Sequence, residues 1–129
     1  MAEGKRASGF LHQRVLRLLK AHYPHPLSGL QLVDLLLEEG ELVPASQVYR
    51  ALKRLIEEGA ARKVLLAGAY VPVWRDPAIL LWCPGCCTVH EVACPEVFAR
   101  LEARAGAVGL HSPRAIVEVP GLCARCARG

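Results

Sequence analysis

The sequence has no asparagine, a single threonine and few aromatic residues, which make up 5% of its 129 residues. Together with an excess of arginine over lysine, this bias suits a GC-rich genome. No apolar run approaches the roughly 18 residues that a membrane-spanning helix needs, and the first twenty residues are too charged for a signal peptide. We therefore expect a cytoplasmic protein, in which cysteines serve better as metal ligands than as disulfide partners.

Signatures of catalysis are also missing from the sequence. It contains no nucleophile elbow, no phosphate-binding loop and no His-Glu-x-x-His motif. We therefore predict that the chain has no catalytic residues and is not an enzyme.

The net charge of +4 comes entirely from the first part of the chain. Residues 1–75 hold eleven Lys and Arg against seven Asp and Glu, whereas residues 76–129 hold five of each. A basic excess confined to one part of a chain favours a nucleic acid as partner, although many solvated surfaces reach the same charge.

Two Cys-x-x-Cys pairs, Cys83–Cys86 and Cys123–Cys126, are separated by 36 residues. Each pair directs two sulfurs at one point, and two pairs supply the four thiolates of a tetrahedral zinc site. We predict one structural Zn²⁺ per chain at these cysteines, which would leave no open coordination position for a substrate water. The alternative interpretation is a pair of redox turns or unligated thiols.

Apolar periodicity predicts three helices in the first part of the chain. The first covers residues 10–22, the second opens at a capping box formed by Ser28 and Gln31, and the third follows Pro44. The buried face of the third helix is predicted to hold Val48, Leu52, Leu55 and Ile56.

Two short β-type runs, 62–67 and 70–74, come after the third helix. Three helices followed by a hairpin predict a winged helix-turn-helix domain over residues 1–75, with its third helix placed to enter a major groove.

The outer face of the third helix is the predicted DNA-reading surface. Arginine can donate two hydrogen bonds to guanine, and tyrosine can pack on a thymine methyl group. The predicted DNA-binding residues are Arg14, Gln47, Tyr49, Arg50, Lys53, Arg54, Arg62 and Lys63. The alternative is an ordinary amphipathic helix with a solvated charged face, and Glu57 and Glu58 agree with it.

Residues 76–129 are predicted to form a smaller domain after a linker at Asp76–Pro77. Its predicted elements are a strand, a strand, a helix and a strand, over 79–82, 88–92, 95–105 and 115–119. An exposed sheet edge and an apolar face would suit dimerisation. The predicted fold class is therefore α+β, with an N-terminal winged helix-turn-helix and a C-terminal α/β dimerisation domain that carries the four-cysteine zinc site.

Four motifs follow one another along nearly the whole chain. They are Gln13-Arg14; Ser46-Gln-Val-Tyr-Arg50-Ala-Leu with Leu55-Ile-Glu-Glu-Gly59; Trp82-Cys83-Pro-Gly-Cys86 with Val89-His-Glu91; and Gly121-Leu-Cys123-Ala-Arg-Cys126. In this order they resemble the ferric uptake regulator family of metal-responsive repressors. Two further segments, Arg62-Lys-Val64 and Ala69-Tyr-Val71, resemble the zinc uptake regulator branch of that family.

The resemblance implies an obligate homodimer that binds pseudo-palindromic operators in double-stranded DNA and controls metal-homeostasis or stress genes. It also implies one structural zinc per protomer and a separate regulatory metal near the hinge between the domains. An effector bound there would close the hinge and select the DNA-binding geometry by population shift.

The regulatory site is where the sequence departs from the family. The zinc branch places a histidine at the position of Arg62 and a cysteine at the position of Val73, and a further family histidine aligns with Arg114. Of the implied ligands Glu91 remains, and one carboxylate cannot hold a sensing metal. We therefore expect a degenerate or rearranged regulatory site.

The candidate ligands of a rearranged regulatory site are Glu91, His90 and His111. Adjacent residues of a strand point to opposite faces, which argues against His90 and Glu91 serving one metal. His111 precedes Arg114 by three residues, so a loop shift could return it to the hinge.

Two other functions remain open at this point. One is a zinc-ribbon interaction module whose helical half binds a protein partner. The other is a thiol-based redox regulator that uses Cys87 or Cys94. Cys87 directly follows Cys86 and could also replace it in the zinc turn.

Overall fold

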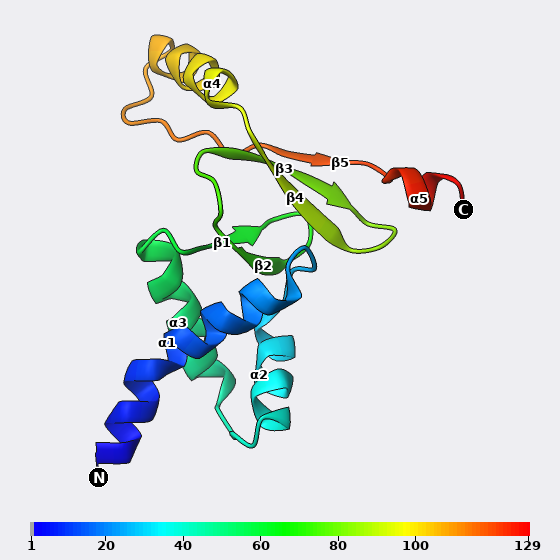
Figure 1. The fold of residues 1–129 in the computed structure, drawn as a ribbon. Helices are drawn as coiled ribbons and strands as arrows, with labels where there is room; N and C mark the ends of the chain where they lie inside the picture. Colours follow the sequence, from blue (N-terminus) through cyan, green and yellow to red (C-terminus); the bar gives the residue numbers. More distant parts are fainter. Residues whose placement is uncertain (1) are drawn as a thin grey trace.

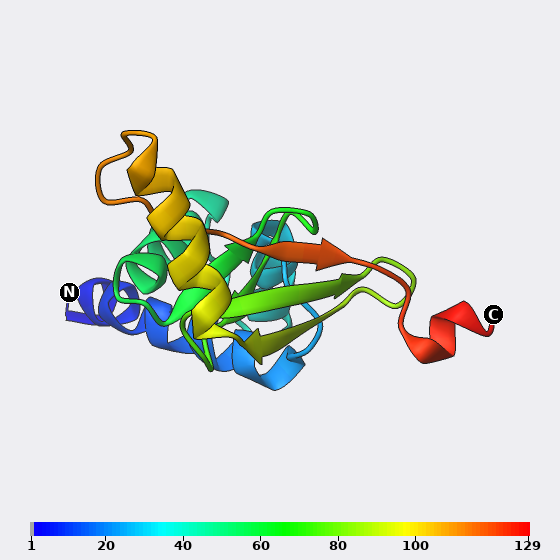
Figure 2. The ribbon, with the colours of Figure 1, turned by 90° about the horizontal axis from the view of Figure 1, so that it is seen from above.

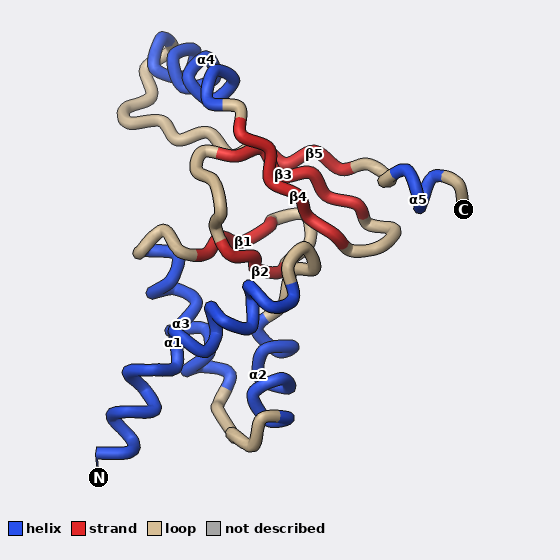
Figure 3. Tube along the Cα trace, viewed as in Figure 1, coloured by secondary structure: helices blue, strands red, loops and turns tan. Residues whose placement is uncertain are grey.

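The computed structural model describes residues 2–129, with side chains from Phe10 onward. In chain order its elements are α1 (Ala2–His22), α2 (Gly29–Glu38), α3 (Ala45–Glu57), β1 (Ala61–Val64), β2 (Ala69–Pro72), β3 (Ala78–Cys83), β4 (Thr88–Ala93), α4 (Pro95–Ala107), β5 (Glu118–Pro120) and α5 (Ala124–Ala127) (Figure 1). Three helices come first and two small sheets follow (Figure 3), which confirms the predicted α+β class. Within the described residues, no helix is both long and apolar enough to cross a membrane.

Helices α1, α2 and α3 share one core of fully buried leucines and valines. Its innermost members are Val15, Leu19, Leu32, Leu36, Val48, Leu52 and Leu55. The predicted capping box opens α2, since Ser28 Oγ accepts the backbone N–H of Gln31 at 3.1 Å and Gln31 Oε1 accepts that of Ser28 at 2.8 Å.

One predicted core position of α3 is wrong. Ile56 is 42% exposed, and Ala51 is buried in its place. The spacing of Val48, Ala51, Leu52 and Leu55 is the narrow i, i+3, i+4, i+7 stripe. Ile56 lies one position beyond this stripe and faces outward.

The hairpin of β1 and β2 is shorter than predicted. The strands pair antiparallel from Ala61 opposite Pro72 to Val64 opposite Ala69. Beyond Val64 the backbone N–H groups of Leu65 and Leu66 donate to the carboxylate of Glu118, at 2.7 and 2.9 Å, instead of to a neighbouring strand. The strand therefore ends three residues before its predicted end, and its turn is attached to β5.

The second sheet has the strand order β4-β3-β5. Strands β3 and β4 form an antiparallel hairpin across the first cysteine turn, whereas β5 pairs with β3 in parallel. The predicted strand 115–119 begins only at Glu118. The backbone N–H of Ala115 donates to Glu102 of α4 at 3.0 Å, so this stretch is held by the helix and not by the sheet.

A second apolar cluster joins the two sheets. Val64 and Val71 of the hairpin pack with Leu80 and Val89 of the second sheet, and all four are at most 3% exposed. The second sheet therefore rests with one face on the hairpin, and α4 lies on its other side, away from α1, α2 and α3 (Figures 1 and 2).

Candidate metal centre and nucleic-acid interface

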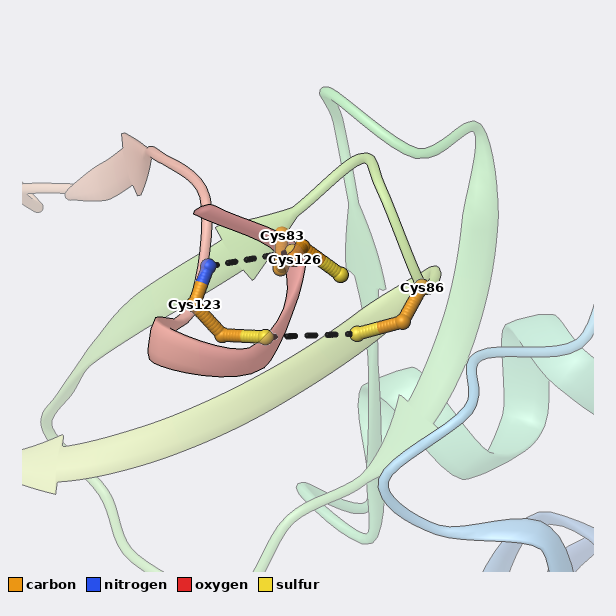
Figure 4. Close-up of side chains that lie close together, drawn as sticks. All are labelled: Cys83, Cys86, Cys123 and Cys126. Atoms are coloured by element: carbon orange, nitrogen blue, oxygen red, sulfur yellow. Dashed lines mark hydrogen bonds between the residues drawn. The ribbon is translucent and has the colours of Figure 1, made fainter. Parts of the chain in front are cut away.

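The four cysteines of the two Cys-x-x-Cys pairs meet at the far end of the second sheet. Strand β3 ends at Cys83, and the turn to β4 holds Cys86. The parallel pairing of β5 with β3 carries the chain back to the same end, where Cys123 caps α5 and Cys126 lies within it. The four sulfur atoms lie within 4.8 Å of one another (Figure 4).

This geometry fits a tetrahedral zinc ion. Zinc–sulfur bonds of about 2.3 Å place the sulfurs of a tetrahedral site about 3.8 Å apart. Cys86 Sγ and Cys123 Sγ are 3.8 Å apart, which matches one edge of such a tetrahedron. Four thiolates form the donor set of a closed structural site, which keeps no position for a substrate.

The thiols of this cluster have divergent acidities. Backbone N–H groups, first that of Cys123 at 3.3 Å and then that of Cys86, lower the pKa of Cys83 to about 6. Hydrogen bonding with Cys123 and then with Cys83 raises the pKa of Cys126 to about 12. Four neighbouring sulfurs cannot all ionise beside one another without a cation, and Zn²⁺ would supply that positive charge.

Gly85 is a residue of this centre that the sequence reasoning missed. A Cβ atom added to it would lie 2.9 Å from Cys126 Sγ and 3.2 Å from a methyl group of Leu122. Only glycine lets the first turn approach the second so closely. The signal was present in the sequence, as the Pro-Gly pair inside the first Cys-x-x-Cys motif.

The remaining two cysteines lie outside the cluster. Cys87 is exposed in the turn with a φ of 56°, and Cys86, not Cys87, contributes to the group of four. Cys94 caps α4, where its hydrogen bond to Glu96 raises its pKa. A raised thiol pKa reduces the thiolate fraction, which disfavours Cys94 as a redox sensor.

Helix α3 presents most of the predicted DNA-binding residues to solvent. Gln47, Tyr49, Arg50, Lys53 and Arg54 are exposed along one face. Arg54 pairs with Glu58 at 3.0 Å, whereas Arg50 and Lys53 have no carboxylate partner among the described side chains. Their charges are therefore available to an external anion.

The predicted DNA-binding residues outside α3 divide into two groups. Lys63 is exposed on the hairpin, with its Nζ 5.9 Å from the ring centre of Tyr70. Arg14 instead pairs with Glu41, and Arg62 turns inward to Glu91 and the carbonyl of Arg75. The guanidinium groups of Arg14 and Arg62 are thus directed at the chain's own acceptors.

Tyr49 lies against the start of α2, at Gly29. A Cβ atom at Gly29 would come within 2.6 Å of the Tyr49 hydroxyl oxygen, so the ring packs directly on the backbone of Gly29. The position of this aromatic side chain on α3 therefore depends on a glycine 20 residues earlier in the sequence.

Replacing Gly29 by alanine is expected to displace the Tyr49 ring and to lower affinity for specific DNA by about fivefold, while the fold survives because the ring can swing into solvent. Fluorescence anisotropy with a labelled duplex would measure the affinity. Gly106→Ala is the matched control, since nothing lies within 4 Å of its Cβ position. That variant should bind DNA normally and be slightly more stable. Equal binding by both variants would contradict the role of Gly29.

The junction between the hairpin and the second sheet holds the three positions at which the sequence departs from the family that it resembles. Arg62, Val73 and Arg114 line one cavity of about 380 Å³. Arg114 is 85% exposed, with its nearest acid, Asp76, at 3.9 Å. Three positions far apart in the sequence therefore do converge, but none of their side chains is a metal ligand.

The candidate regulatory ligands are not brought together. Glu91 is buried on the face of β4 that meets the hairpin, and His90 is exposed on the opposite face, as the strand alternation predicts. His111 is exposed in the loop between α4 and β5. Among the described residues, the four cysteines are the only group of three or more potential ligands close enough to share a metal ion.

The chain is similar in sequence to zinc uptake regulation proteins. No protein-family model matches the chain. The zinc uptake regulation protein of Escherichia coli K12 is 31% identical over 117 residues, which cover 87% of this chain and 68% of that protein. Its counterpart in Shigella flexneri matches to the same extent.

Solved structures give the same picture. The crystal structure of holo XcZur superposes with a TM-score of 0.80 at 32% identity and covers 92% of this chain and 84% of its own. A zinc uptake regulator complexed with zinc and DNA gives 0.82 at 30% identity, over 91% and 81%. The ferric uptake regulator of Francisella tularensis with iron gives 0.65 at 18% identity, over 90% of both chains, and shares the fold.

Proposed function

This chain belongs to the ferric uptake regulator family, near its zinc uptake regulator branch. From this membership we propose which residues contact DNA, which surface forms the dimer and what occupies the hinge between the domains. It is a DNA-binding transcriptional repressor and not an enzyme, it works as a dimer, and its four-cysteine site holds a structural zinc ion. We place its target genes in metal homeostasis or stress response, and its site of action in the cytoplasm.

Helix α3 is the proposed reading element. The observation that carries this assignment is its exposed face, on which Arg50 and Lys53 lack carboxylate partners among the described side chains and Tyr49 packs on Gly29 of α2. In a winged helix the third helix enters the major groove, and a dimer presents two such helices one DNA turn apart or a multiple of it. The operator is therefore expected to be pseudo-palindromic.

Lys63 and Arg54 are proposed to contact the phosphate backbone beside the groove. Both are exposed, and both flank the reading face. Arg14 and Arg62 are not included among the proposed contacts, because they pair with Glu41 and Glu91 and are 26% and 20% exposed, whereas Arg54 is 54% exposed in its surface pair with Glu58. A contact with phosphate would first have to break these pairs.

The outer face of the second sheet is the proposed dimer surface. Leu81, Val92 and Val119 are 40%, 40% and 46% exposed on the face turned away from the hairpin. Helix α4 lies on this side of the sheet (Figure 1), and its Leu101 is 45% exposed. Burying such apolar side chains against a second copy would remove them from water and fix the separation of the two α3 helices.

We propose that the regulatory site at the hinge is degenerate and holds no sensing metal. Its expected positions carry Arg62, Val73 and Arg114, and the remaining candidates Glu91, His90 and His111 lie on opposite faces of β4 and in the exposed loop between α4 and β5. Two guanidinium groups at the hinge would repel a divalent cation.

Salt-dependent binding to duplex DNA tests the proposed function. Phosphate contacts release counterions, so the affinity of the zinc-loaded dimer should fall steeply when salt rises from about 50 to about 200 mM, by about tenfold or more. Anisotropy titrations with a random-sequence duplex would measure this slope, and selection from a duplex library would recover the operator. A zinc-ribbon module that binds a protein partner would show no such binding, and that result would reject the proposal.

A further inference from the structure

The carboxylate of Glu91 lies at the meeting point of the winged helix and the second sheet, and its side chain is 1% exposed. We infer that the guanidinium group of Arg62 is its permanent counterion and latches these two parts together, so that the DNA-binding arrangement is held without any dissociable metal ion. This inference rests on the proposed function, because it names how that function is regulated.

Glu91 is fully engaged by groups of the chain itself. Its Oε1 accepts the backbone N–H groups of Trp74 at 3.1 Å and Arg75 at 2.9 Å, and its Oε2 lies 3.3 Å from the N–H of Trp74. Arg62 Nη2 approaches Oε2 at 3.5 Å. A carboxylate with these partners has little left to offer a metal ion.

The backbone of Glu91 adds two further ties across the same junction. Its carbonyl oxygen accepts Arg75 Nη1 at 3.3 Å, and its N–H donates to the hydroxyl oxygen of Tyr23, at the end of α1, at 3.3 Å. Arg62 in turn donates to the carbonyl oxygen of Arg75. Glu91 of β4 therefore connects three other parts of the chain, which are strand β1, the segment after β2 and the end of α1.

A cation is required at this point, and Arg62 supplies one that cannot leave. A buried carboxylate without a counter-charge is costly, and removing one partner of a buried pair is more damaging than removing both. Arginine stays protonated at all physiological pH values, so the pair does not depend on metal supply. Nearby Arg75 and Arg114 make the junction more positive still and oppose the entry of a divalent cation.

The consequence concerns the reading helix. Helix α3 continues through Gly59 into β1, which carries Arg62, so the latch sets the orientation of α3 relative to the dimer face. A dimer binds its operator only when both helices have the right separation. The chain should therefore bind its operator with the structural zinc as its only metal.

Arg62→Met is the first test, because methionine keeps much of the apolar stem and removes the charge. We expect operator affinity, measured by anisotropy on the duplex selected with the unmodified protein, to fall by about tenfold or more. The zinc content should stay at one per protomer. Arg100→Met is the matched control, since Arg100 is exposed on α4, and it should bind as the unmodified protein does.

The double variant Arg62→Met/Glu91→Gln tests whether the two residues act as a pair. Removing the uncompensated carboxylate should recover part of the affinity that Arg62→Met loses. Additive losses would overturn the latch. So would an Arg62→Met variant that binds the operator as tightly as the unmodified protein.

Metal titration separates a built-in latch from a metal sensor. Adding Zn²⁺, Mn²⁺ or Fe²⁺ to dimer that already carries its structural zinc should change operator affinity by less than about twofold. A second bound metal that raises the affinity well beyond this would overturn the inference.

Hydrogen exchange at the Trp74 and Arg75 amides keeps the latch testable without DNA. Both N–H groups donate to Glu91, so Arg62→Met should accelerate their exchange while amides of the α1–α3 core stay protected. Unchanged exchange at both amides in Arg62→Met would reject the latch.

This measurement decides the latch even if the unmodified protein binds no duplex DNA, a result that would reject only the proposed function. If Arg62→Met lost its zinc or its fold, Arg62→Lys would be measured instead. Lysine keeps the positive charge, so the latch requires that both amides in Arg62→Lys stay about as protected as in the unmodified protein.

Discussion

Replacing Cys83 by serine is expected to release the structural zinc and to unfold the second sheet with helix α5. Cys83 is the most buried of the four cysteines, and its sulfur accepts the backbone N–H of Cys123, so serine would remove a ligand and a link between the two turns. Metal binding energy in such a site is folding energy, and its loss should cost about 5 kcal/mol or more. For a chain of this size that lowers the Tm by about 15 °C or more.

Zinc stoichiometry, with circular dichroism during thermal unfolding, would measure this effect. Cys87→Ser is the matched control, because Cys87 directly precedes β4, beside Cys86 but outside the group of four. It should retain one zinc per protomer and melt as the unmodified protein does. Zinc retained by Cys83→Ser, or lost by Cys87→Ser, would show that the ligand set is a different one.

Arg50→Ala is expected to cause the largest loss of specific DNA binding. A good bidentate contact between arginine and guanine contributes about 1–3 kcal/mol, and a symmetric dimer makes it twice, so affinity should fall by about a hundredfold. Stability should change little, since Arg50 is exposed and makes no intrachain ion pair among the described side chains. Binding to random-sequence DNA should weaken far less, which separates base reading from phosphate contact.

Anisotropy with the selected operator and with a random duplex would measure both affinities. Arg100→Ala removes the same charge from α4, away from the reading helix, and should leave both affinities unchanged. If Arg50→Ala weakened the two duplexes equally, Arg50 would be a phosphate contact and another residue of α3 would read the bases.

Much of the fold was predictable because its determinants are local. The capping box at Ser28 and the stripe of Val48, Leu52 and Leu55 depend on residues at most a few positions apart. The four-cysteine cluster was predictable for another reason. Zinc tolerates few ligand sets, so two Cys-x-x-Cys pairs define a site without knowledge of the path between them.

The partners of the charged side chains could not be predicted from the sequence. The resemblance places Arg62 and Glu91 at one implied metal site, but it does not predict that they form an ion pair. Nothing near Arg14 indicates that it pairs with Glu41. The same holds for Glu118, which ends the first hairpin by accepting the N–H groups of Leu65 and Leu66. These contacts depend on how the helices and the two sheets pack, and that packing is set by side chains far apart in the chain.

The parallel pairing of β5 with β3 has a consequence for the order in which the protein folds during its synthesis. Strand β3 gains β4 as a neighbour as soon as the first cysteine turn has emerged, but its other edge waits for β5, which is made only after α4. Throughout that interval the nascent chain presents an unpaired strand edge and half a set of zinc ligands. Strand β5 and the Cys123–Cys126 pair follow one another closely, so pairing of this edge and completion of the zinc ligands occur at nearly the same stage of synthesis.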